Sequence, residues 1–137
     1  MVRAQSDSLE APLIEIISTT TSPKAIGPFS QAIRAGGFVF VSGQLPIDPA
    51  TGEIVSGDIS FQTERVIENL KTVLAAAGSS ISKVVKTTIF LQDLGDYSAV
   101  NDVYARYFSS APPARSTVEI ARLPRDARIE IELMALA

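Results

Sequence analysis

One apolar stretch, Val84–Leu91, constrains the fold more than any other part of the chain. Its sequence, Val-Val-Lys-Thr-Thr-Ile-Phe-Leu, is too rich in β-branched residues and too continuously apolar for a half-exposed strand. Such a run is typical of a central strand that is buried on both faces. Helical periodicity precedes it from Asp58 and follows it from Asp96. We therefore expect a central strand between two helices.

Two segments have the residue spacing of an amphipathic helix. In the first, Gly78 stands where a helix C-terminal glycine belongs, and at 1.5 Å per residue the helix should be about 30 Å long. Its apolar stripe consists of Ile59, Val66, Ile67, Leu70, Val73, Leu74 and Ala77. The second helix should be capped by Asp96 and end near Phe108, before Pro112. Its buried stripe consists of Val100, Val103, Tyr104 and Tyr107.

Short β-rich segments account for the remaining strands: residues 13–17, 29–35, 38–42, 115–121 and 128–136. Gly36 and Gly37 predict a tight hairpin turn between the second and third strands. The order strand, strand, strand, helix, strand, helix, strand, strand predicts an α+β fold, a mixed sheet with both helices on one face. We expect residues 13–137 to form this single domain and residues 1–12 to form a disordered tail.

The last predicted strand places apolar residues on both of its faces. Glu130, Glu132, Met134 and Leu136 alternate with Ile129, Ile131, Leu133 and Ala135. The sheet face away from the helices is therefore partly apolar. A partly apolar open face suggests self-association.

The residue types that are missing exclude several kinds of chemistry. The chain has no His and no Cys, so it lacks the commonest general base, a thiol nucleophile and the usual transition-metal ligands. We expect no metal site. The net charge of −3 and the scattered basic residues argue against a nucleic-acid partner. No apolar run approaches the ~18 residues of a membrane helix, and the N-terminus resembles no signal peptide. We therefore expect the protein in the cytoplasm.

Arg115 is the strongest candidate for ligand binding. It begins a predicted strand directly after Pro112-Pro113-Ala114, and the two prolines give the chain a stiff approach. The planar guanidinium matches a carboxylate through two parallel hydrogen bonds. The alternative is an ordinary surface arginine on a strand edge, since most arginines lie in water.

Glu130 and Glu132 place two carboxylates on one face of the last strand. Either they pair with basic residues, or one of them holds or activates a water. If the last two strands form a hairpin that turns near residue 124, Arg115 lies opposite Met134 and four residues from Glu130. Then either the long arginine reaches along its strand, or the site forms between neighbouring chains.

Two further polar positions allow a functional and a plain interpretation. Ser42-Gly43-Gln44 ends a predicted strand in a glycine-containing turn, where backbone amides can face a ligand; the alternative is a simple turn. Asn101 lies off the apolar stripe of its helix, which is typical of a solvated residue.

Taken together, these segments resemble the Rid family, also called the YjgF family, and within it the RidA-type enamine and imine deaminases. The resemblance runs from about Ile17 to the C-terminus. Its motifs are Ala25-Ile26-Gly27-Pro28-Phe29-Ser30-Gln31-Ala32, Val41-Ser42-Gly43-Gln44, Gly52-Glu53, Val84-Val85-Lys86-Thr87-Thr88, Val100-Asn101, Pro113-Ala114-Arg115-Ser116, Leu123-Pro124 and Ile129-Glu130-Ile131-Glu132.

The resemblance implies a chorismate-mutase-like fold and a homotrimer with clefts between subunits. It implies hydrolysis of 2-imino acids, such as 2-iminobutanoate and 2-iminopropanoate, to 2-oxo acids and ammonia without a cofactor. The family's essential arginine falls on Arg115 and its water-associated glutamate on Glu130. Its substrate contacts fall on Phe29, Ser42, Gly43, Asn101 and Thr117.

Two of these positions depart from the family pattern. A tyrosine common in the family is Phe29 here, which can line a pocket but cannot donate a hydroxyl hydrogen bond. A cysteine found in many members is Thr117, so this position should contribute its backbone carbonyl or its shape.

The expected mechanism has Arg115 hold the substrate carboxylate while a water held by Glu130 attacks C2. Three alternatives stay open. The first is a non-catalytic trimer that binds or senses small carboxylates, in which Glu130 is structural. The second is an RNA-cleaving translation inhibitor, an older description of the family, which the acidic pI and the absence of His oppose. The third is a chaperone-like surface, for which the sequence offers no particular feature.

Overall fold

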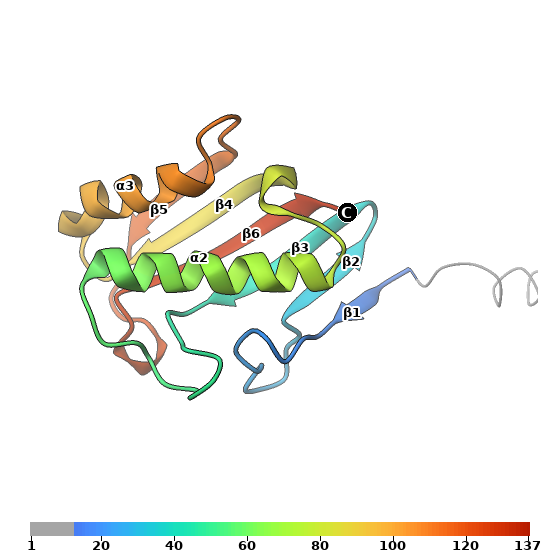
Figure 1. Cartoon of the computed structure of the whole chain (residues 1–137), viewed down its shortest axis with the longest axis horizontal. Coiled ribbons are helices and arrows are strands. Elements are labelled where there is room, and N and C mark those ends of the chain that lie inside the picture. The colour runs from blue at the N-terminus through green and yellow to red at the C-terminus, as the bar shows by residue number, and fades with distance from the viewer. Residues whose placement is uncertain (1–12) are drawn as a thin grey trace, which may run out of the picture.

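The helices and strands follow one another in the predicted order. The computed structural model describes residues 13–137, so the predicted tail at residues 1–12 lies outside the described residues. The strands are β1 (Glu15–Ile17), β2 (Ala32–Ala35), β3 (Phe38–Gln44), β4 (Val84–Leu91), β5 (Ala114–Glu119) and β6 (Ile129–Leu136); the helices are α2 (Ile59–Ala76) and α3 (Tyr97–Tyr107). The α+β prediction is confirmed, with both helices on one face of the sheet (Figure 1).

The six strands form one mixed sheet in the order β1-β2-β3-β6-β4-β5. Only β4 and β5 are parallel, because α3 carries the chain across one face of the sheet between them. Strand β6 pairs with both β3 and β4, so β5 is left at the edge. The predicted hairpin of the last two strands is therefore wrong, and so is the register that placed Arg115 opposite Met134.

Helix α2 covers the middle of the sheet and forms one side of the core. Asp58 caps it, since its carboxylate accepts a 2.9 Å hydrogen bond from the backbone amide of Phe61. Gly78 follows the helix with a φ of 76°, which a glycine adopts without strain. The side chains of Ile67, Leu70 and Leu74 are fully buried against the sheet.

Strand β4 is covered on one face only, which differs from the prediction. Thr87, Ile89 and Leu91 are fully buried under the helices, whereas Phe90 on the other face is half-buried and Val85 is exposed. The other face of the sheet also exposes the apolar side chains of Phe38, Phe40, Met134 and Leu136. This open face has the partly apolar character that the alternation in β6 predicts.

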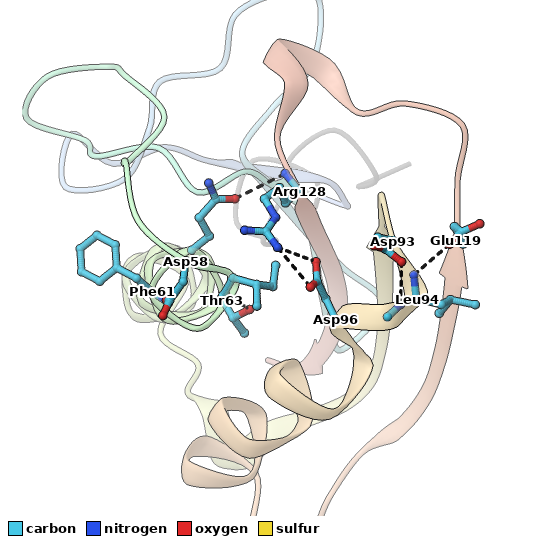
Figure 2. Close-up of polar contacts among 11 residues, drawn as sticks. Asp58, Phe61, Thr63, Asp93, Leu94, Asp96, Glu119 and Arg128 are labelled. Carbon is cyan, nitrogen blue, oxygen red and sulfur yellow. Dashed lines mark hydrogen bonds and ion pairs between the residues drawn. The ribbon is translucent and has the colours of Figure 1, made fainter.

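The start of α3 is fixed by an ion pair instead of the predicted cap. Asp96 stands at the N-cap, but its side chain makes no capping hydrogen bond. Both of its carboxylate oxygens accept hydrogen bonds from Nη2 of Arg128, at 3.1 and 3.0 Å (Figure 2). The ion pair therefore joins α3 to the residue just before β6.

Among residues 13–137 no helix has the length and apolar character to cross a membrane.

Candidate active site

Glu130 lies in a cavity on the open face of the sheet. The cavity has a volume of about 630 Å³, and its lining includes Phe29, Ser42, Gly43 and Glu130. These four residues come from the loop before β2, from β3 and from β6. We call them the glutamate half-site. The structure thus brings together four of the seven residues that the sequence suggested.

The carboxylate of Glu130 lies directly against the backbone of Gly43. A Cβ atom on Gly43 would come within 2.7 Å of Cδ of Glu130, closer than such contacts occur in proteins. The residues around Gly43 lie inside β3 and not in the predicted turn. Val41 pairs with Leu133 and Gln44 with Ile131, so β3 holds one residue more than β6 between these pairs. The irregularity and the missing side chain together make room for the carboxylate.

Ser42 ties this part of β3 to the loop that carries Phe29. Its hydroxyl donates a 2.6 Å hydrogen bond to the carbonyl of Ser30, and its backbone amide donates to the carbonyl of Gln31. The side chain of Phe29 is 53% exposed at the cavity. The Ser42 hydroxyl is therefore committed to holding the loop, and the phenylalanine contributes an apolar wall.

Glu130 is half-buried, and its environment favours the protonated form. Burial raises the pKa of the Glu130 carboxyl above its usual value, and the negative charge of Glu132 raises it further. A carboxyl group with a raised pKa is a stronger proton acceptor than an ordinary carboxylate, and it can return the proton. Within residues 13–137 no group of acidic or other ligating side chains could hold a metal ion.

Arg115 lies between β5 and α3, against two tyrosine rings. Its Nη2 donates a 2.9 Å hydrogen bond to the hydroxyl of Tyr97. Its Cζ lies 5.4 Å from the ring centroid of Tyr97 and 4.8 Å from that of Tyr104. Both distances are within the range of a cation–π interaction.

Asn101 and Thr117 lie near this arginine. Tyr97, Asn101 and Tyr104 share one face of α3, since they are separated by four and three residues. Thr117 lies two residues after Arg115 on the same side of β5. Its Oγ1 is buried and has no hydrogen-bond partner among residues 13–137. We call Arg115, Thr117, Tyr97, Asn101 and Tyr104 the arginine half-site.

The two tyrosines are parts of the site that the sequence does not predict. The helical spacing places Tyr104 in the buried stripe of its helix and gives Tyr97 no role. The available signal was their spacing around Asn101, which puts all three on one helix face. Their relation to Arg115 depends on the parallel pairing of β5 with β4, which the sequence did not reveal.

The two half-sites lie on opposite faces of the sheet. Arg115 pairs with Thr87 of β4, which is buried beneath the helices, so Arg115 points to the helix side. Glu130 stands between Ile129 and Ile131, which belong to the core, so it points to the open side. Within one chain, Arg115 and Glu130 do not meet.

Comparison with known proteins identifies the family. Residues 19–137 match the family described as Endoribonuclease L-PSP. The chain belongs to the L-PSP family. This L-PSP protein is 55% identical to a RutC family protein of Pyrococcus horikoshii, over 88% of this chain and 96% of the relative. It is 46% identical to a 2-iminobutanoate/2-iminopropanoate deaminase of Capra hircus, over 88% of each chain.

A solved structure supports the same assignment for the fold. The L-PSP protein superposes on Escherichia coli TdcF with bound serine at a TM-score of 0.86 and 42% identity, over 90% of this chain and 98% of that one. The resemblance to the Rid family is thereby confirmed, since the matching relatives include proteins named as reactive intermediate and 2-iminobutanoate deaminases.

Proposed function

We propose that this protein hydrolyses 2-imino acids, such as 2-iminobutanoate and 2-iminopropanoate, to 2-oxo acids and ammonia. The observation that carries the proposal is the pair of half-sites: an arginine that has no carboxylate partner among residues 13–137, and a carboxyl group of raised pKa beside Gly43. The names of the Capra hircus relative and of a reactive intermediate deaminase of Arabidopsis thaliana point to the same reaction.

The arginine half-site can take the substrate carboxylate. Within residues 13–137, no acidic side chain lies within ion-pairing distance of Arg115. One guanidinium nitrogen bonds the hydroxyl of Tyr97, and the fork keeps further donors for a ligand. A carboxylate bound through two of these donors would have a fixed orientation. The neighbour TdcF binds serine, which also carries a carboxylate.

The glutamate half-site can supply the reacting water. A water held by the Glu130 carboxylate attacks the electrophilic C2 of the protonated imine, and Glu130 accepts a proton as the C–O bond forms. Glu130 then returns this proton to the nitrogen of the carbinolamine. The C–N bond breaks to release ammonia, and the hydroxyl group gives up its proton to solvent as the C=O bond forms. The overall reaction consumes one water and yields the 2-oxo acid and ammonia. An imine is already electrophilic, so positioning and charge complementarity suffice without a covalent intermediate.

The proposal requires two chains for each site. Because Arg115 and Glu130 point to opposite faces of their own sheet, we place the reaction in a cleft where the arginine half-site of one chain meets the glutamate half-site of the next. The exposed apolar residues Phe38, Phe40, Met134 and Leu136 support self-association through the open face. A closed ring of three chains gives three equal clefts, as in the homotrimer that the family resemblance implies.

The direct test generates 2-iminobutanoate with a threonine dehydratase and follows its conversion to 2-oxobutanoate. We expect the wild-type protein to accelerate the decay, Arg115→Ala to abolish the acceleration, and Arg115→Lys to lose most of it, because lysine offers a point charge without the fork. Arg106→Lys is the matched control, since its side chain is 64% exposed on α3 and bonds no residue of either half-site. Unchanged decay with the wild type would rule out the deaminase.

The same experiment separates the non-catalytic alternative. A regulatory carboxylate-binding trimer would bind 2-oxobutanoate through Arg115 but leave the imine decay unchanged. RNA cleavage is a less favoured alternative, because the chain has a net charge of −3 and no histidine. Salt-sensitive RNA binding by nuclease-free protein would revive it.

A further inference from the structure

We propose that Tyr97 is a positioning residue that holds the guanidinium of Arg115 in the orientation needed to bind the substrate carboxylate. The inference rests on the proposed function, because it assigns the carboxylate to Arg115. It adds a residue that the family resemblance did not supply. The bond from Arg115 to the Tyr97 hydroxyl carries the argument.

The two tyrosines have different roles at the guanidinium. Tyr104 is buried, and its hydroxyl shares a 2.8 Å hydrogen bond with Thr87. It therefore offers Arg115 only the face of its ring, 4.8 Å away. Tyr97 offers both its ring and its hydroxyl. A ring face attracts the charge but leaves the planar fork free to rotate, whereas a hydrogen bond to one nitrogen fixes its direction.

Tyr97 itself stands on a segment that is tied to two strands. Asp96, the residue before it, receives the two hydrogen bonds from Arg128, the residue just before β6 (Figure 2). The amide of Leu94 donates a 2.9 Å hydrogen bond to the carboxylate of Glu119 at the end of β5. Asp93 closes the turn by accepting from the amide of Gly95 at 2.7 Å. The first turn of α3 therefore starts from a fixed position relative to the strand that carries Arg115.

The exposure of Tyr97 separates this role from core packing. Its side chain is 42% exposed, so removing the hydroxyl leaves no buried polar group unsatisfied and opens no core cavity. A phenylalanine would keep the ring contact with Arg115 and lose only the hydrogen bond. The loss should therefore weaken carboxylate binding and leave the water attack at Glu130 unchanged.

The test compares Tyr97→Phe with Tyr107→Phe, an identical chemical change on the same helix. The hydroxyl of Tyr107 donates to Glu68 of α2 and does not contact Arg115. For Tyr97→Phe we expect KM for 2-iminobutanoate to rise about five-fold, with kcat within about two-fold of the wild type. The Kd for 2-oxobutanoate, measured by calorimetry, should rise by the same factor. Tyr107→Phe should leave KM and Kd unchanged.

Each outcome decides the proposal. Unchanged KM and Kd in Tyr97→Phe would overturn the positioning role while the deaminase assignment stands, and so would a fall in kcat at constant KM. An equal rise of KM in both variants would also overturn it, since that is the effect of a general structural change. If the wild-type protein binds 2-oxobutanoate but does not turn over the imine, the deaminase assignment is wrong. The ratio of the Kd of Tyr97→Phe to that of the wild type then still decides the role of Tyr97. A wild type that neither binds nor turns over overturns both.

Discussion

Arg115 and Glu130 extend from opposite faces of the same six-stranded sheet. The arginine leaves edge strand β5 on the helix side, whereas the glutamate leaves β6 on the open side. The sheet itself therefore lies between an imino acid bound to Arg115 and the Glu130 of the same chain. This arrangement makes the number of chains in each active site open to direct test.

The first prediction is that two inactive variants restore each other in mixed oligomers. Arg115→Ala and Glu130→Gln should each lose most of the imine deaminase activity when assayed alone. In a cleft between two chains, activity returns when the Glu130→Gln chain supplies the arginine and the Arg115→Ala chain supplies the glutamate. Random assembly of equal amounts meets this condition in about a quarter of the clefts of a closed ring. Refolding the two together should therefore recover about a quarter of wild-type activity.

The control replaces the Glu130→Gln chain with the double variant Arg115→Ala/Glu130→Gln. No chain in that mixture carries Arg115, so no activity should return. Native mass spectrometry establishes that the two chains share oligomers. Absence of recovery in oligomers that contain both single variants would contradict the shared cleft.

The second prediction concerns Gly43, which provides the space for the Glu130 carboxylate. In Gly43→Ala the new methyl group would overlap the carboxyl group, whose flexible side chain must then swing away. Displacement of a reacting group by about 1 Å can cost about 100-fold in rate, so we expect a loss of that order in kcat. Stability should change little, because the φ of Gly43 lies outside the left-handed region and the neighbour that moves is a flexible side chain.

A double-mutant comparison tests the cause of this loss. In the Glu130→Ala background no carboxylate occupies the space, so adding Gly43→Ala should reduce the residual rate no further. A further 100-fold loss in that background would show that Gly43 acts by another route.

The sequence predicts the local elements well because their signals are local. Periodicity places α2 within one or two residues of its observed ends, and the apolar run gives the bounds of β4 as observed. Alternation in β6 correctly puts Glu130 and Glu132 on one face. The position of β6 between β3 and β4 depends on contacts between residues far apart in the chain. For this reason the predicted hairpin of the last two strands is wrong.

The parts of the site that the sequence predicts have local signals, whereas the missed parts depend on contacts between distant segments. Glu130, Gly43 and Phe29 meet in one cavity, and each belongs to a motif visible in the sequence. The hydrogen bond of Tyr97 to Arg115 joins residues 18 positions apart through the edge of the sheet. No local pattern reports such a contact, because it is created by the parallel crossover from β4 to β5.

The third prediction is a pH dependence of activity that Glu132 controls. Burial and the charge of Glu132 raise the pKa of Glu130 above its usual value of 4.5. A general base acts when deprotonated, so kcat/KM should rise with pH through this raised pKa. Glu132→Gln removes the neighbouring charge and should move the rise to lower pH. A profile that does not shift in Glu132→Gln would contradict the assignment of the titrating group to Glu130.

The fourth prediction is the matching pH dependence of stability. The folded protein keeps a proton on Glu130 at pH values where the unfolded chain has already released it. The free energy of unfolding should therefore fall as the pH rises from about 4.5 through the raised pKa. Glu130→Gln does not titrate and should lack this contribution. Thermal denaturation of both proteins between about pH 5 and 8 measures the difference, and parallel curves would rule it out.

The last prediction concerns the ion pair that joins α3 to β6. Arg128 and Asp96 make two hydrogen bonds, and the Asp96 side chain is only 16% exposed, so Asp96→Asn should lower the free energy of unfolding by about 1 kcal/mol. Asp126→Asn is the control, because the side chains of Asp126 and its partner Arg122 are 75% and 78% exposed, and such a pair should contribute nothing measurable. Urea denaturation at one protein concentration compares the two variants. Asp96→Asn should also raise KM, since Tyr97 directly follows Asp96 in the chain. Equal stability of Asp96→Asn and Asp126→Asn, with KM unchanged in both, would show that the ion pair neither stabilises α3 nor positions the arginine half-site.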